Sequence, residues 1–62
     1  MNAGPQLSSV ATALAELTRR VTELAEDLAR SDRDDLAGEL FEAERALLAA
    51  GRRLGKVVDQ LV

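Results

Sequence analysis

A coiled-coil repeat that is interrupted once, near residue 32, is the feature that most constrains the fold of this chain. In the first half, large apolar residues recur at alternating spacings of three and four, as on one face of a coiled-coil helix. They are Leu7, Val10, Leu14, Leu17, Val21, Leu24 and Leu28. The second half repeats the spacing with Leu36, Leu40, Ala43, Leu47, Ala50, Leu54, Val57 and Leu61. Continuing the first series would place Ser31, Asp35 and Gly38 on the apolar face, so the sequence predicts two helices.

The segment between the two series, "RSDRDD", is entirely polar. Ser31 or Asp32 is expected to cap a second helix, with Asp34 or Asp35 three residues further on. The segment holds neither glycine nor proline, so one continuous helix is the alternative. Because register and polarity change together, a hairpin is favoured. The predicted single domain, residues 1–62, has a helix at about 5–30, a turn at about 31–34 and a helix at about 35–61.

A hairpin that folds back about residue 32 brings the two apolar series into register, over roughly 40 Å at 1.5 Å per residue. The expected layers are Leu28 with Leu36, Leu24 with Leu40, Val21 with Ala43, Leu17 with Leu47, Leu14 with Ala50, Val10 with Leu54, and Leu7 with Val57. Each layer joins an a position to a d position, as antiparallel packing requires. These residues are therefore the predicted core.

A second row of small and apolar residues runs beside the first in both halves. Its members are Ala11, Ala15, Thr18, Thr22, Ala25 and Ala29, then Ala37, Phe41, Glu44, Leu48, Gly51, Gly55, Val58 and Val62. A lone hairpin would leave this row in water, and a chain of 62 residues without cysteine or histidine has no disulfide or histidine-bound metal to supplement a small core. The expected fold is therefore all-α, an antiparallel hairpin that dimerises into a four-helix bundle.

Gly51 and Gly55 lie on this second row, where each costs a helix about 1 kcal/mol relative to alanine. The favoured interpretation is a notch that a second copy enters, with Phe41 as the entering side chain; the alternative is that the glycines fray the last turns. The predicted self-association residues are Phe41, Glu44, Leu48, Gly51, Gly55, Val58, Ala15, Thr18 and Thr22. Glu44 is expected to bind a threonine hydroxyl or an arginine such as Arg20.

Catalysis usually requires a group that titrates near neutral pH or an activated nucleophile, and the chain has no histidine, cysteine or tyrosine. No enzymatic activity, cofactor or metal is expected. The predicted function is a small cytoplasmic protein–protein interaction module, an adaptor, assembly or regulatory protein, that forms homodimers and binds a further protein. No apolar run approaches membrane-spanning length.

The alternative function is that of a dimeric nucleic-acid-associated regulator. It would use the basic patch of Arg45, Arg52, Arg53 and Lys56 to contact phosphates. A net charge of −3 and a single aromatic residue argue against it. Ion pairs within or between copies are the favoured role of these cations.

Overall fold

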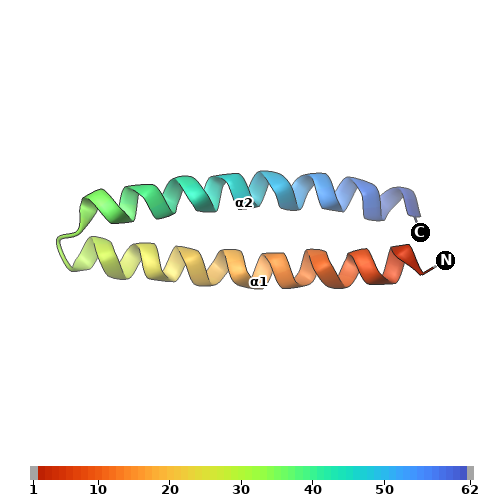
Figure 1. Ribbon diagram of the computed structural model, residues 1–62, viewed down its shortest axis with the longest axis horizontal. Helices are drawn as coiled ribbons and strands as arrows, with labels where there is room; N and C mark the ends of the chain where they lie inside the picture. The colour runs from red at the N-terminus through yellow and green to blue at the C-terminus, as the bar shows by residue number, and fades with distance from the viewer. Residues whose placement is uncertain (1, 62) are drawn as a thin grey trace.

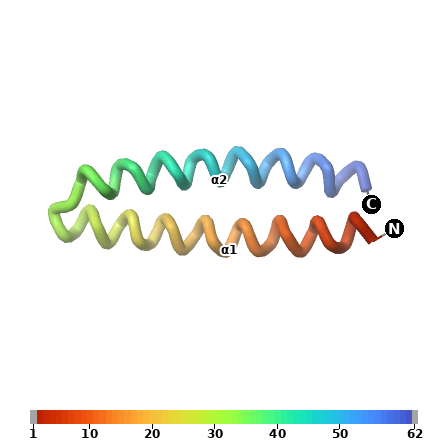
Figure 2. The backbone as a smooth tube through the Cα atoms, in the orientation of Figure 1, coloured from red at the N-terminus to blue at the C-terminus, as the bar shows by residue number. Residues whose placement is uncertain are grey.

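The two helices lie side by side and antiparallel, joined by a tight turn (Figure 1). In this computed structural model, which describes residues 2–61, α1 spans Ala3–Arg30 and α2 spans Asp34–Leu61, each with 28 residues. Both ends of the chain lie at the same end of the rod, which measures 48 × 14 × 11 Å over its Cα atoms (Figure 2). The predicted helical hairpin is confirmed, and one continuous helix is excluded.

Helix α1 begins two residues before the expected start. The Gln6 backbone N–H donates to the Asn2 carbonyl at 3.1 Å, which closes the first turn. Pro5 lies in that turn, where its missing N–H costs nothing because the first amides of a helix have no intrahelical acceptor. The proline therefore fits the start of α1 even though it is not the first helical residue.

The turn is a Schellman motif, and this corrects the expected capping. The Arg33 N–H donates to the Leu28 carbonyl at 2.9 Å and the Asp32 N–H to the Ala29 carbonyl at 3.4 Å. Asp32 has a φ of 61°, the left-handed conformation that this motif requires and that glycine usually supplies. Ser31 and Asp32 therefore end α1 and do not cap α2.

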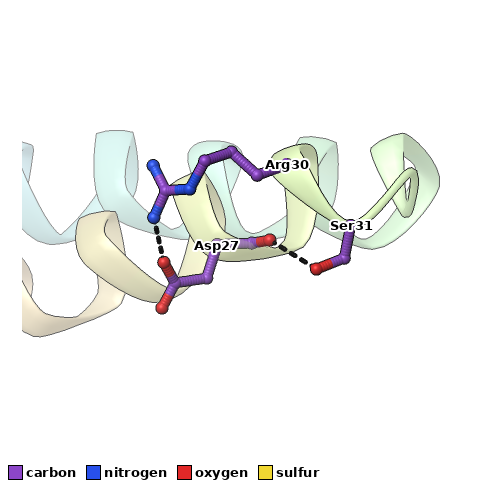
Figure 3. A network of polar contacts seen from close by, with 3 residues as sticks. All are labelled: Asp27, Arg30 and Ser31. Carbon is purple, nitrogen blue, oxygen red and sulfur yellow. Dashed lines mark hydrogen bonds and ion pairs between the residues drawn. The ribbon is translucent and has the colours of Figure 1, made fainter.

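Side chains near the end of α1 reinforce the turn (Figure 3). The Ser31 hydroxyl donates to the Asp27 carbonyl at 3.0 Å, and the Arg30 guanidinium pairs with the Asp27 carboxylate. The Asp27 carbonyl also accepts from the Ser31 backbone N–H at 3.1 Å, so the hydroxyl adds a second bond to the same acceptor at the end of α1. Arg30 also places a positive charge at the negative end of the helix dipole.

Helix α2 starts after Arg33, whose carbonyl accepts from the Ala37 N–H at 2.9 Å. Asp34 and Asp35 lie in the first turn, where carboxylates interact favourably with the positive end of the helix dipole. The Arg33 guanidinium approaches the Asp35 carboxylate at 3.4 Å. This contact, followed by the Leu36 N–H, lowers the pKa of Asp35 below its ordinary value.

The seam between the helices differs from the expected one by a rotation of both helices. The residues that face the partner helix are Gly4, Leu7, Ala11, Leu14, Thr18, Val21, Ala25 and Leu28 on α1, and Ala37, Leu40, Glu44, Leu47, Gly51, Leu54 and Val58 on α2. One half of the predicted series is in this seam, but the other half is not. Leu24 is 57% exposed and Leu17 is 52% exposed, so the predicted layers that contain them are wrong.

Small side chains explain the rotation, because they let the two backbones approach closely. Ala25 is completely buried and Ala37 is 3% exposed. At the open end, a Cβ added to Gly4 would lie 3.5 Å from the Leu61 carbonyl oxygen. Interaxial distance depends on the size of the side chains at the contact, so a seam of alanine and glycine beside leucine permits a close approach.

The left-handed turn residue yields a stability prediction. The substitution Asp32→Gly should raise the free energy of unfolding by about 0.5–1 kcal/mol, because glycine has no Cβ to clash with the backbone at this φ. Asp32→Val should lower it by about 1 kcal/mol or more, since a β-branched residue tolerates this region worst. Thermal and urea unfolding followed by circular dichroism measure both changes. The reverse order of stability would contradict the Schellman assignment.

Candidate interaction surface

A continuous row of aliphatic side chains is exposed on one face of the hairpin. We call it the Val10 face; its residues follow at seven-residue intervals on each helix. They are Val10, Leu17 and Leu24 on α1, and Leu36, Ala43, Ala50 and Val57 on α2. All seven are exposed, and the five large ones have 41–57% of their surface in contact with solvent. None carries a polar side-chain atom.

The two helices present this row on the same side. Val10 and Val57 line one shallow hollow at the open end of the hairpin, together with Leu7 of the seam and the exposed Leu61 at the end of α2. A step of seven residues returns to nearly the same side of a helix, about 10.5 Å further along. The other members of the row therefore follow Val10 and Val57 toward the turn on that side.

The opposite face is smaller and more mixed. We call it the Phe41 face; its residues are Ala15, Thr22, Ala29, Phe41, Leu48 and Gly55. Leu48 is 49% exposed, whereas Phe41 is half-buried against the rod. A Cβ added to Gly55 would meet nothing within 4 Å, so the space beside this glycine is open.

The nine predicted self-association residues are divided between the seam and the Phe41 face. Thr18, Glu44, Gly51 and Val58 lie in the seam between α1 and α2, and Thr18 is only 5% exposed. The space beside Gly51 is taken by Leu14 of the same chain, whose Cδ2 is 3.9 Å from an added Cβ. The other five, Ala15, Thr22, Phe41, Leu48 and Gly55, lie on the Phe41 face.

Sequence reasoning missed the Val10 face as a surface because it placed those residues in the seam. The signal was present in the residue types of the neighbouring rows. Most positions directly after the Val10 row carry small side chains, with Glu44 and Val58 as the exceptions, and small residues favour the closer contact. Ala11, Ala25, Ala37 and Gly51 are the residues that show this.

One polar contact crosses the apolar seam. The Thr22 hydroxyl donates to the Glu44 carboxylate, and it also lies 3.1 Å from the Thr18 carbonyl. The Thr18 hydroxyl donates to the Leu14 carbonyl at 2.7 Å. The expectation that Glu44 binds a threonine hydroxyl is confirmed. No buried side-chain nitrogen or oxygen in the described part of the chain lacks a hydrogen-bond partner.

The basic patch lies on the outer side of α2. Arg45 pairs with Glu42 of the same helix at 3.3 Å. Within residues 2–61, Arg52, Arg53 and Lys56 are exposed and form no ion pair. The patch therefore keeps three cations available near the open end of the rod.

Charge is distributed unevenly along the rod. Residues 21–44, which contain the turn, carry nine carboxylates and two arginines, a side-chain charge of −7. The remaining residues carry six cations and two carboxylates, a charge of +4. One end of the hairpin is strongly acidic, and the rest is basic.

Residues 2–61 contain no cluster of three or more acidic, histidine or cysteine residues arranged to hold a metal ion. Neither α1 nor α2 has the length and apolar character of a membrane span. Comparison with known protein families, with curated proteins and with solved structures found no match for this chain.

The contact between Thr22 and Glu44 can be measured with a double-mutant cycle. Thr22→Val and Glu44→Met each remove one partner of the hydrogen bond. Either single substitution already breaks the bond, so the double variant should be about 1 kcal/mol more stable than the sum of the two single losses predicts. Urea unfolding gives the free energy of unfolding of the wild type, the two single variants and the double variant. Thr12→Val, at an exposed position on α1, is the control and should change stability by less than about 0.5 kcal/mol. A coupling indistinguishable from zero would contradict a contact between these side chains in solution.

Proposed function

We propose that this chain is a non-enzymatic protein–protein interaction module that associates with itself, two hairpins forming a four-helix bundle. The exposed aliphatic row of the Val10 face carries the proposal. Five large aliphatic side chains in one continuous row form a patch of the kind that marks interaction sites on soluble proteins. Scattered single leucines would not support the same argument.

The weakness of the hairpin's own core supports the proposal. Among residues 2–61, only Gly4, Thr18, Ala25 and Ala37 are buried, and no large side chain there is fully enclosed. A two-helix unit of this size rarely gains enough from one seam to offset the entropy of ordering its chain. A second hairpin that covers an outer face would add the missing burial, at about 25 cal/mol per Å² of apolar surface.

A bundle of this type would act by presenting its remaining surface to other proteins, as a small adaptor, assembly element or regulatory partner. The outer sides of both helices supply exposed charged groups for such contacts, including Arg52, Arg53 and Lys56. A dimer would carry two copies of each of these groups. A partner with two binding sites would then bind the dimer more tightly than the monomer, because the second contact forms within a complex that already exists.

Self-association makes thermal stability depend on protein concentration. A hundredfold increase in concentration should raise the unfolding temperature by about 10 °C, since it adds roughly 2.7 kcal/mol to the stability of a dimer with about 124 residues. Circular dichroism melts across that range measure the shift, and sedimentation equilibrium measures the mass. A monomer up to about 1 mM, with a melting temperature independent of concentration, would overturn the proposal.

A further inference from the structure

We infer that the second copy docks on the Val10 face end for end, with its turn over the open end of the first. This rests on the proposed self-association and specifies the face and the direction. In this arrangement α1 packs on α1 of the second copy and α2 on α2. Leu17 meets the second copy's Leu17 near the two-fold axis, and Glu39 meets the second copy's Arg53.

The face is large enough for a specific interface. The rod is 48 Å long and 14 Å wide over its Cα atoms, which gives a projected face of about 670 Å² before side chains widen it. Stable interfaces of standard size bury about 800 Å² on each partner. A second hairpin that covers the whole face would therefore reach this range.

The row of side chains is self-complementary when one copy is reversed. Reversal about Leu17 brings Val10 opposite the second copy's Leu24. On α2, reversal about the point between Ala43 and Ala50 brings these two alanines opposite each other and Leu36 opposite Val57. An isologous interface requires such a match between a surface and its own reversed copy.

Side-chain volumes also match at the centre of the face. Leu14 lies beside Gly51 and Thr22 beside Glu44, so Leu17 is level with the part of α2 between Ala43 and Ala50. The two alanines leave room in the middle of α2 where the pair of Leu17 side chains enters. Alternation of large and small residues across a layer is how bundle cores reach native packing density.

The charges on the rim of the Val10 face select the direction. The charged residues three positions after the row, all exposed, are Arg20 and Asp27 on α1, and Glu39 and Arg53 on α2. End-for-end docking brings Glu39 opposite Arg53, and Arg53 has no ion pair within residues 2–61. Docking in the same direction would instead bring Asp27 opposite the second copy's Glu39 and set the acidic segments, residues 21–44 of each copy, side by side. Like charges that face each other across an interface disfavour that arrangement.

The same test of charge disfavours the Phe41 face. On that side the charged, exposed rim residues of α2 are Arg45, Arg52 and Asp59. End-for-end docking centred on Leu48 would bring Arg45 level with the second copy's Arg52, two like charges on facing rims. The Phe41 face also has one large exposed side chain, Leu48, against five on the Val10 face.

The face is tested with a matched pair of leucines. Leu17 on the Val10 face is 52% exposed and Leu48 on the Phe41 face is 49% exposed, so both can accept a polar group without filling the seam. Leu17→Glu sets two carboxylates against each other at the two-fold axis and should weaken dimerisation by about 100-fold or more. Leu48→Glu should leave the dissociation constant within about threefold. Sedimentation measures the constants, and circular dichroism confirms that both variants remain helical.

The direction is tested by exchanging charges. Glu39→Lys alone and Arg53→Glu alone should each weaken the homodimer about tenfold, because two like-charged pairs replace two opposite pairs. A mixture of the two single variants should form heterodimers in preference to either homodimer, since every rim pair is then opposite in sign. A spin label on Ser31→Cys reports the direction independently. End-for-end docking places the two turns at opposite ends of a bundle about 48 Å long.

The outcomes separate this inference from the proposed function. A dimer that survives Leu17→Glu but is lost with Leu48→Glu would show that the Phe41 face is the interface. Labelled turns found close together would show docking in the same direction. Either result overturns the inference and leaves self-association standing, whereas a monomeric wild-type chain overturns both.

Discussion

Close contact between small side chains in the seam is the constraint on which the rest of the structure depends. Because Ala25, Ala37 and Gly51 face the opposite helix, the two backbones approach closely and each helix turns its larger neighbours outward. The leucines and valines of the Val10 face are exposed for this reason. The same contact that makes the hairpin compact therefore makes it incomplete as a folded unit, since its large apolar side chains mostly remain in water.

The sequence was sufficient to predict two helices and the place where they separate. Unbroken spacing of three and four in each half, and the change of register at Ser31, determine this without tertiary information. The chemistry of the turn was harder to predict, because Asp32 adopts a conformation that usually requires glycine. Any polar residue between two apolar series can cap one helix or end the other, and local sequence alone does not distinguish the two roles.

The rotation of the helices could not be read from periodicity. Each helix has apolar or small residues at four of its seven heptad positions, a stripe too wide for contact with a single partner helix. Periodicity locates the stripe but does not say which edge faces the other helix of the same chain. Size decides this in the structure, since the row that contains Ala11, Thr18 and Ala25 packs more closely than the row of Val10, Leu17 and Leu24. The predicted interface residues Thr18 and Gly51 consequently lie inside the hairpin.

Heptad periodicity alone does not fix how far α1 is shifted along α2, because sliding one helix by seven residues restores most of the apolar contacts in the seam. The pair formed by Thr22 and Glu44 opposes such a slip. A shift of one heptad would place Glu44 beside Ala15 or Ala29, which offer no hydrogen-bond donor from their side chains, and would leave a partly enclosed carboxylate without its hydroxyl. A single polar contact in an apolar seam thus specifies register more than it adds stability.

The charged residues on the rim of the Val10 face have a comparable role outside the seam. They affect the direction in which two copies dock more than the affinity between them. Exposed pairs contribute little to stability, and at physiological salt the field of a charge decays over about 8 Å. Only rim residues that meet directly across an interface, such as Glu39 and Arg53, can therefore discriminate strongly between the two directions of docking. The excess of carboxylates in residues 21–44 adds a longer-ranged repulsion between turns that increases as salt is removed. Apolar burial would hold two copies together in either direction, and the charge pattern favours the one in which the acidic ends lie apart.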